Sequence, residues 1–598
     1  MNTNTNMGNT VYWHKNQVIV RLKSQRQRST SEEHLINPPI EVVSQKLRDA
    51  FKSLKQRNIL KEDVQFIEAL EHCMLVSTTA SVDNVDGALF CRINSSTRTG
   101  MGSMQGNGGI AGMGDDDRTL AVIEQLDYGK ALQEILQQDE GLRRAGFSIE
   151  CVDAIPHWFK AGTDGNIPTQ GCPLSPPIPV KESGAAGRWK LQFSQLPDAL
   201  ENATGKGVKV LVLDTLPKPD QILKAAHQAG SNNMLLQEMT NDMRDEKPFD
   251  AVPPSINVNY QSVPDIILEG DPPKRVVTGK DIYGRHAGFH MADHGLFIAG
   301  IVRDLAPEAT IECIRVLNDD GVGDLNTLIK ALKDIHKRML GVNPDTKKEG
   351  DLYNKPVVIN LSLVVLPPED DIPIPKQMVE AILKPSRDLL SSLLQGLADQ
   401  GAIFVASAGN DSDPRMDTSE KRFGPRYPAA LADQLTVMIP VGAVNRNGDA
   451  ARYSNYPGPH GIATYGGDIP KPDPWLPSAM DHVVAHVDTT DPIDALCGVY
   501  TAAKYPALSM NDPEPEYAAP YSKAWAHWSG TSFATPIISA LAARVLQGRD
   551  PKSTNVRQVI LDAAMDEVIW TEVGEEGRDI PEPMIMAVQV HHRRRQPG

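Results

Sequence analysis

A serine at position 532 lies where the chain passes from a glycine turn into an apolar run. The stretch reads Gly530-Thr531-Ser532-Phe533-Ala534-Thr535-Pro536, and the residues from Ile537 to Leu546 are apolar on nearly every face, which predicts a buried helix. Ser532 would begin that helix, where unpaired backbone N–H groups and the positive end of the helix dipole stabilise negative charge. This position suits a nucleophilic serine beside a developing oxyanion, although a serine is also a common N-cap of a core helix.

Two other stretches supply the partners that a serine nucleophile needs. The short apolar run from Gly207 to Leu213 ends in Asp214, as expected of a buried parallel strand that brings a side chain to the carboxyl edge of its sheet. His294 begins an apolar segment that can form a helix. Aspartate, histidine and serine in this order make an acyl-transfer triad. Ser532 attacks, His294 accepts and returns its proton, and Asp214 fixes the imidazole tautomer and steadies its charge.

The residues around these three positions resemble the motifs of the subtilisin-like serine peptidases. The serine motif of that family, Gly-Thr-Ser-x-Ala-x-Pro, is complete from Gly530 to Pro536. The aspartate motif is met at Asp214 and Thr215, with Leu216 in place of the usual glycine. The resemblance covers residues 189 to 564. The histidine motif, His-Gly-Thr-His-Val-Ala-Gly, is matched at His294, Gly295, Ala299 and Gly300 and departed from at Leu296 and Phe297.

A fourth stretch, Ala406-Ser407-Ala408-Gly409-Asn410, resembles the strand end that carries the family's oxyanion-hole asparagine. The resemblance implies an α/β fold, with a parallel-sheet catalytic domain that is covered by helices on both faces. It also implies a serine endopeptidase with Asp214, His294 and Ser532 as its triad. Asn410 would donate its side-chain amide to the tetrahedral oxyanion, together with a backbone N–H at Ser532.

The resemblance also implies a first specificity pocket. Its base would be Arg426, the residue before the Tyr427-Pro428 pair. A guanidinium in a partly desolvated pocket holds a carboxylate through charge-assisted hydrogen bonds, so we predict cleavage after Asp or Glu. The alternative is that Arg426 turns outward to solvent. Val364 replaces a usual glycine in one wall and should narrow the pocket. The walls would be formed by two strand ends, Ser362, Leu363, Val364 and Ala406, Ser407, Ala408, Gly409.

The elements that must position these residues are indicated by alternating apolar runs and amphipathic segments. Strands separated by helices predict a parallel sheet with its site at the carboxyl ends of the strands, where the candidate triad falls. The predicted strands are Val208–Leu213, Thr310–Val316, Pro356–Leu363, Ala402–Ala406 and Thr436–Ala443. The predicted helices are Leu296–Val302, Leu325–Leu340, Ser386–Gln400 and Ser532–Gln547.

Residues 1–162 are predicted to form a separate α+β domain. Strand and helix patterns follow a β-α-β-β-α-β order, with a glycine-rich flexible insertion at 94–117. This is the shape of the prodomains of subtilisin-like peptidases, so the resemblance implies an intramolecular inhibitor, with an unrelated interaction module as the alternative. The strands are predicted at 17–23, 64–70, 73–77, 88–93 and 147–155, and the helices at 41–56 and 118–144.

The remaining chain divides around the catalytic core. The proline-rich residues 163–187 predict an exposed linker, where proteolytic processing is easiest. Residues 188–570 are predicted to form the catalytic domain and 571–598 a C-terminal tail. Insertions at 216–290 and 470–527 flank catalytic residues, and we interpret them as walls that shape the substrate site, or else as surface padding.

Composition limits the partners that we expect. A net charge of −16 and a sequence pI near 5.4 argue against nucleic acid. No apolar run has the length of a signal peptide core or a membrane span, so we expect a cytoplasmic protein acting on protein or peptide substrates.

The six cysteines include no Cys-x-x-Cys pair. His290, Asp293 and His294 could be imagined as metal ligands, but no second cluster completes a site, so we predict neither metal nor cofactor.

Two other functions are open. One is an inactive relative that binds peptide segments without cleaving them, which the departures at Leu216 and Leu296 would allow. Labelling by a serine-reactive phosphonate would distinguish it from a peptidase. The other is an acid-acting relative that uses Glu and Asp with Ser, which the intact His294 and Asn410 disfavour.

Overall fold

The computed structural model describes most of the catalytic region and part of the N-terminal region. The predicted strand at 88–93 and the predicted helix at 118–144 lie outside the described residues. The residues that the structure describes are 10–22, 25–26, 35–36, 45, 49, 52, 56, 64–70, 73–78, 101–105, 152–161, 177–180, 189–243, 255–265, 267–268, 274–275, 291–343, 345–365, 376–412, 422–468, 494–504, 523–564, 566–571 and 579–590.

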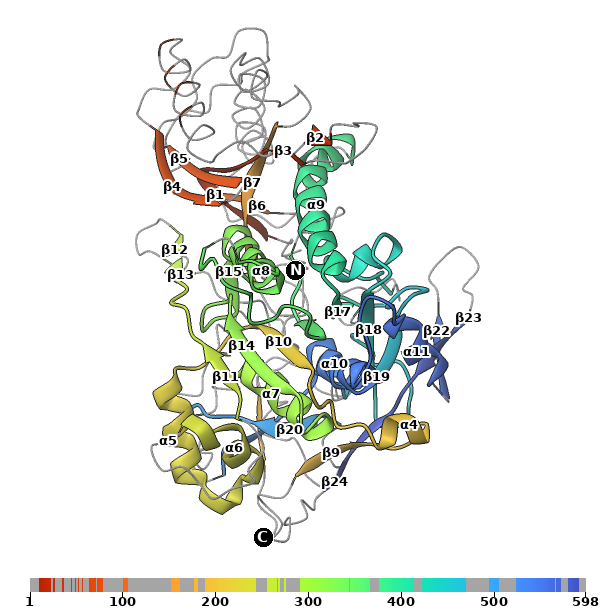
Figure 1. The fold of residues 1–598 in the computed structure, drawn as a ribbon. Helices are drawn as coiled ribbons and strands as arrows, with labels where there is room; N and C mark the ends of the chain where they lie inside the picture. Colours follow the sequence, from red (N-terminus) through yellow and green to blue (C-terminus); the bar gives the residue numbers. More distant parts are fainter. Residues whose placement is uncertain are drawn as a thin grey trace, which may run out of the picture.

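A nine-stranded sheet forms the centre of the molecule (Figure 1). Its strands run in the order β11-β14-β10-β16-β17-β18-β19-β23-β22, and every pair is parallel except the last. The bounds are β10 Lys209–Asp214, β11 Asn257–Asn259, β14 Thr310–Arg315, β16 Val357–Leu361, β17 Ala402–Ser407, β18 Met438–Val444, β19 Ile462–Tyr465, β22 Asp566–Thr571 and β23 Asp579–Met584.

Helices cover both faces of this sheet. Helices α7 (His294–Leu305) and α10 (Thr531–Leu546) pack on one face, and α8 (Leu325–Met339) and α9 (Lys376–Asp399) pack on the other. Successive residues of β10 alternate between the two cores, because side chains along a strand point to opposite faces. The even-numbered Val210 and Val212 join α7 and α10, and Leu211 and Leu213 join α8 and α9. The predicted α/β fold class is therefore confirmed.

The N-terminal strands form a second sheet, in which every pair is antiparallel. The order β7-β1-β5-β4 sets the last strand beside the first, as in a split-βαβ sandwich. Strand β6 pairs with β1, although it lies within the predicted flexible insertion. The bounds are β1 Thr10–Leu22, β4 Val64–Leu70, β5 Cys73–Thr78, β6 Met101–Gln105 and β7 Val152–Ala161.

The N-terminal sheet is joined to the catalytic region through one strand pair. Strand β15 (Val322–Asp324), which leads into α8, pairs antiparallel with the end of β7. In this register Val322 lies opposite Ala161, and Asp324 opposite Phe159. Strand β7 also contacts α8 and α9, and Figure 1 shows the N-terminal strands above α8 and beside α9.

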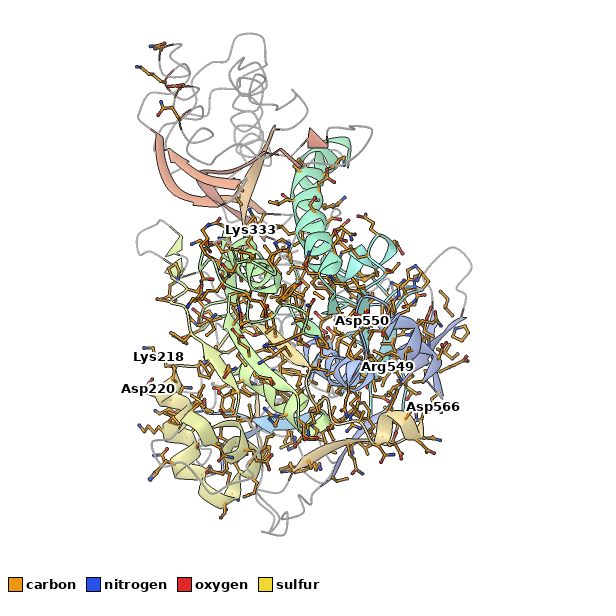
Figure 2. All side chains as sticks on the ribbon, viewed as in Figure 1. Lys218, Asp220, Lys333, Arg549, Asp550 and Asp566 are labelled. Carbon is orange, nitrogen blue, oxygen red and sulfur yellow. The ribbon has the colours of Figure 1, made fainter. Side chains whose placement is uncertain are left out.

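The insertion at 216–290 is partly helical rather than wholly irregular. It forms α5 (Pro219–Ala229), α6 (Met234–Met239) and the edge strand β11. Proline is tolerated at the first turn of α5, because its missing N–H would have no intrahelical partner there. The inner side of α5 is apolar and buried, and Lys218 and Asp220 mark its exposed start (Figure 2).

Smaller sheets join distant parts of the chain. Strands β20 (Leu496–Val499) and β21 (Trp525–Trp528), from the second insertion, pair with each other, and β8 (Ile178–Pro179) adds to β21. Part of the predicted 163–187 linker is therefore ordered, and Pro177 beside it is buried. Strand β9 (Lys190–Phe193) pairs with β24 (Ala587–Val590).

Strands β23 and β24 lie within the predicted C-terminal tail, so part of that tail belongs to the catalytic fold. Pro581 and Pro583 interrupt the β-branched pattern of β23, which hides the strand from sequence analysis. Within the described residues, no helix has both the length and the apolar content needed to cross a membrane. The remaining short elements are α4 Asp198–Glu201, α11 Val556–Asp562, and the paired strands β2 Gln25–Arg26 with β3 Leu35–Ile36 and β12 Ile267–Leu268 with β13 Lys274–Arg275.

Candidate active site

Asp214 is the last residue of β10 and lies at the carboxyl edge of the central sheet, as predicted. Its side chain is fully buried. The backbone N–H of Thr215 donates to Asp214 Oδ1 across 2.7 Å, which fixes the carboxylate against its own strand end. The Thr215 hydroxyl donates to the carbonyls of Met291 and Ala292, at 2.9 and 3.0 Å. Thr215 therefore joins the end of β10 to the loop that enters α7.

His294 is the first residue of α7, and Gly295 allows that helix to approach β10 closely. A Cβ atom at position 295 would lie 2.2 Å from the Thr215 carbonyl oxygen and 2.8 Å from Asp214 Cβ. The backbone N–H of Gly295 also donates to the Thr215 hydroxyl across 3.3 Å. Only a residue without a side chain fits between the helix and the strand end at this separation.

The imidazole of His294 lies 2.8 Å from Asp214, measured from Nδ1 to Oδ1, and both side chains are fully buried. A carboxylate acceptor assigns the proton to Nδ1, so that Nε2 carries the basic lone pair. Nε2 has no hydrogen-bond partner among the described residues. The ring packs edge-on to Trp528 and tilted to Phe533, with centroids 5.4 and 5.0 Å away. The imidazole is therefore held in one orientation with its basic nitrogen unused.

Ser532 lies in the first turn of α10 and is also fully buried. Its hydroxyl donates to the carbonyl of Ser362 across 3.2 Å, and is not bonded to His294 Nε2. The Ser362 hydroxyl donates in return to the Ser532 carbonyl across 2.9 Å. Asn360 completes this network, because its amide donates to the Ser362 hydroxyl and its oxygen accepts from Ser539. The end of β16 is thus fastened to the start of α10.

Asn410 follows β17 and points its amide toward the same helix start. Its Oδ1 accepts from the backbone N–H and the hydroxyl of Thr531, at 3.0 and 2.8 Å. These two donors fix the orientation of the amide, which leaves Nδ2 as a free donor. Within the described part of the chain, Nδ2 has no partner although it is fully buried. An amide held in this way is suited to donate to an oxyanion beside Ser532.

Asn455 supports this strand end and was not predicted from the sequence. Its side chain is fully buried, and its Oδ1 accepts from the Asp411 N–H and the Ser412 hydroxyl, both at 2.9 Å. Its Nδ2 donates to Asp411 Oδ2 and to the Ala408 carbonyl. A single asparagine far along the chain gives no pattern, so only the fold reveals this role.

Arg426 lies beside the strand end that carries Asn410 rather than pointing into solvent. Its side chain is 16% exposed, its Nε donates to Asp411 Oδ2 across 2.9 Å, and its guanidinium stacks over the Phe423 ring at 4.8 Å. Gly409 contacts the same group, because a Cβ there would lie 3.1 Å from Arg426 Cγ. Of the predicted pocket walls, the described residues Ser362, Leu363, Val364, Ala406, Ser407 and Ala408 are all buried.

Asp293, directly before His294, is a second buried carboxyl group close to the site. Its pKa is raised to about 6, chiefly because burial disfavours the charged form, while hydrogen bonds from Thr501 and Ala502 partly oppose the shift. Among the described residues, no group of three or more His, Cys, Asp or Glu side chains is arranged to hold a metal. Burial raises the pKa of the Cys313 and Cys497 thiols, so neither is a thiolate nucleophile.

Comparison with known proteins gives one family. The Subtilase family profile matches residues 205–579, more than half of the chain. No curated protein matches the chain. Among solved structures, a cold adapted subtilisin-like serine proteinase is 16% identical with a TM-score of 0.33, covering 64% of this chain and 89% of that one. A lanthipeptide protease is 18% identical with a TM-score of 0.34, covering 64% of this chain and 87% of that one. A prenylagaramide maturation protease is 17% identical with a TM-score of 0.32, covering 61% of this chain and 88% of that one.

Proposed function

The chain belongs to the subtilase family of serine-type peptidases, and on that premise we propose that it is an endopeptidase with Ser532 as nucleophile, His294 as base and Asp214 as orienting carboxylate. The observation that carries this proposal is the 2.8 Å contact between His294 Nδ1 and Asp214 Oδ1, which leaves a buried, unpartnered Nε2. That nitrogen can accept the serine proton only after the Ser532 hydroxyl turns away from the Ser362 carbonyl. A substrate main-chain N–H that binds this carbonyl would release the hydroxyl for that rotation.

The chemistry then proceeds through a tetrahedral intermediate. Ser532 Oγ attacks the scissile carbonyl, His294 takes the proton and later gives it to the leaving amine, and Asp214 stabilises the imidazolium. Asn410 Nδ2 and a backbone N–H at Ser532 would donate to the oxyanion. The orientation of the Asn410 amide, set by Thr531, supports this role because Nδ2 needs no rearrangement to meet the developing charge.

The test is labelling and hydrolysis with a matched serine control. A fluorophosphonate should label the wild-type protein and the Ser553→Ala variant, whose serine is exposed, and fail to label Ser532→Ala. Peptide hydrolysis should follow the same pattern. Labelling or hydrolysis retained by pure Ser532→Ala would refute the triad assignment. A wild-type protein that binds peptides but is never labelled would instead be an inactive, peptide-binding relative.

We further propose that acidic residues are preferred before the scissile bond. Arg426 is held at the oxyanion strand end, but Asp411 already compensates part of its charge. The preference should therefore be smaller than an unpaired guanidinium would give, since the field at a substrate carboxylate is reduced. Peptide libraries should show Asp and Glu enriched before the cut in wild type and no longer enriched in Arg426→Gly. Absence of the enrichment in wild type would overturn the proposal.

The N-terminal domain is proposed to be an intramolecular inhibitor, with residues 1–162 as that domain, 163–187 as the connection and 188–570 as the catalytic domain. Strand β7 pairs with β15, so the last strand of the N-terminal sheet is hydrogen-bonded to the catalytic region. His294 and Ser532 are both fully buried. Some part of the chain must move before a peptide bond can reach Ser532.

A further inference from the structure

The side chain of Asp293 stands in the N-cap position of α7 but does not cap the helix. An aspartate there usually accepts from the backbone N–H groups of the first turn. Instead, Asp293 Oδ1 accepts from the backbone N–H of Thr501 at 2.7 Å and from the Thr501 hydroxyl at 2.5 Å. Both residues are buried, with exposed fractions of 1% and 0%. The carboxylate therefore binds a segment far along the chain rather than its own helix.

The two insertions supply α5, α6, β20 and β21, which we call the satellite unit together with Thr501. Thr501 lies two residues after the end of β20, and its hydroxyl accepts from Gln221 of α5 across 3.1 Å. The two insertions are also joined by hydrogen bonds from Asn233 to the Ala524 carbonyl and from Trp525 to the Asn232 carbonyl. The satellite unit is thus one hydrogen-bonded assembly.

The satellite unit contacts the start of α7 at two points. Asp293 binds it through Thr501, and Trp528, the last residue of β21, packs edge-on against the His294 ring. Thr215 in turn holds the carbonyls of Met291 and Ala292 to the end of β10. The backbone that carries His294 is therefore held between the central sheet and the satellite unit.

We propose that Asp293 is a positioning residue for the triad, which holds the start of α7 on Thr501 so that the His294 imidazole stays aligned between Asp214 and Ser532. The proposal rests on the proposed peptidase function. Its physical basis is that catalysis requires near-attack geometry, and a misplacement of about 1 Å can reduce a rate by about 100-fold. Among the described residues, the His294 imidazole has one hydrogen bond, at Nδ1, so the position of Nε2 depends on the backbone that carries the ring.

The charged groups near Asp293 do not explain the arrangement by themselves. Asp319 faces it and repels its charge, but Asp319 is paired with Arg315 across 2.5 Å. Asp214 is occupied by His294. Because no cation is bonded to Asp293 among the described residues, its interaction with Thr501 is one of hydrogen-bond geometry. A neutral side chain with the same acceptor should therefore replace it.

The experiment compares Asp293→Ala, Asp293→Asn and Thr501→Val in the full-length chain, with Asp388→Ala, an exposed carboxylate of α9 paired with Lys384, as the matched control. We expect kcat to fall about 10- to 100-fold in Asp293→Ala with KM unchanged, and to stay within about threefold of wild type in Asp293→Asn and Asp388→Ala. Thr501→Val keeps one of the two bonds, so its kcat should lie between those of Asp293→Ala and wild type.

A second readout does not depend on activity. The downfield proton resonance of His294 Nδ1–H, assigned by its loss in His294→Ala, should shift or broaden in Asp293→Ala and Thr501→Val and persist in Asp293→Asn. If Asp293→Ala does not fold, Thr501→Val decides by the same two measurements. An unchanged resonance with unchanged kcat in the folded variants would overturn the proposal, as would equal losses in Asp293→Asn and Asp293→Ala. A wild type that is inactive yet shows these resonance changes would refute the peptidase function alone.

Discussion

The proposed chemistry of the site depends on two polar atoms that the described residues around them leave without a partner. His294 Nε2 and Asn410 Nδ2 are buried and unpartnered among the described residues, whereas the other ends of the same side chains are bonded to Asp214 and Thr531. A buried donor or acceptor without a partner costs stability, so it persists where a ligand or a transition state supplies the missing partner. The two atoms thus define where a substrate should contribute its own groups.

Replacing Asn410 with alanine tests the oxyanion role at this scale. We expect kcat to fall about 100- to 1,000-fold with little change in KM, because the lost donor acts on charge that exists only in the transition state. That range was measured for the equivalent loss in subtilisin itself and is applied here as an expectation. Steady-state peptide hydrolysis measures it, and Asn445→Ala, on an exposed turn, is the control. A loss that appears mainly in KM would argue against Asn410 as an oxyanion donor.

The raised pKa of Asp293 predicts a specific dependence of stability on pH. Its pKa lies near 6 in the folded protein against an ordinary value of 3.8, because burial disfavours the charge. The folded state therefore binds the proton more tightly, and the stabilisation from this group is present below about pH 4 and lost as pH rises through 6. The unfolding free energy of Asp293→Asn minus that of wild type should therefore increase by up to about 3 kcal/mol between pH 4 and pH 7.

Denaturant unfolding of both proteins at pH 4, 5, 6 and 7 measures this difference. Taking the difference between variant and wild type cancels the titration of all other groups. A difference that does not change with pH would show that Asp293 is ionised in the folded protein with an ordinary pKa.

Motifs close in sequence could be found from the sequence, and contacts between distant residues could not. Asp214, His294, Ser532 and Asn410 each lie in a short stretch whose residue order is itself informative. Asn455 acts on Asp411, and Asp293 acts on Thr501, across long separations with no local pattern. From the sequence, Asp293 is only an acidic neighbour of His294 that could be imagined as a metal ligand. Its use as a hydrogen-bond acceptor for another segment depends on the folded backbone.

At the scale of elements, the close approach of α7 to β10 brings the histidine to its carboxylate. Gly295→Ala should disturb that approach, because the new Cβ would lie 2.2 Å from a backbone oxygen that no side-chain movement can remove. We expect destabilisation of about 1–3 kcal/mol and a large loss of kcat. Gly396→Ala in α9 is the matched control, since its Cβ would meet nothing closer than 3.7 Å and alanine favours a helix. Thermal unfolding and hydrolysis rates measure both, and a fully active Gly295→Ala would contradict the geometry.

Elements with uniform apolar runs were the easiest to predict. Strands β10, β16 and β17 are buried on both faces, and the residues predicted for them agree with the structure to within a few positions. Strand β23 was missed because it contains two prolines, which an antiparallel pairing on one side still tolerates. Helix α9 begins earlier than predicted and continues through Pro385. Tertiary packing overrides local preference at both places.

At the scale of the whole molecule, the N-terminal sheet and the catalytic region share one sheet edge. Strand β15 completes the order β15-β7-β1-β5-β4, so the pairing continues from one part into the other. Such a shared edge is the arrangement by which an extended segment adds to a sheet, with main-chain hydrogen bonds providing much of the affinity. The described N-terminal strands run in the order β7-β1-β5-β4. The predicted split-βαβ fold of this part and its inhibitory role both stay predictions.

Cutting the connection between the two parts tests that role in the full-length chain. A recognition site for a specific exogenous protease can be introduced after residue 163, before β8, which pairs with β21 and should stay with the catalytic part. We expect peptide hydrolysis to be low before the cut and to rise at least tenfold after cutting and dissociation of the N-terminal part. The rise should be slowed when the N-terminal part is kept at high concentration, since an inhibitor held only by non-covalent contacts obeys mass action. The uncut protein that carries the same site is the control for the insertion. If hydrolysis is already complete before the cut, or if it stays constant after the two parts separate, the N-terminal domain is an interaction module and does not inhibit the peptidase.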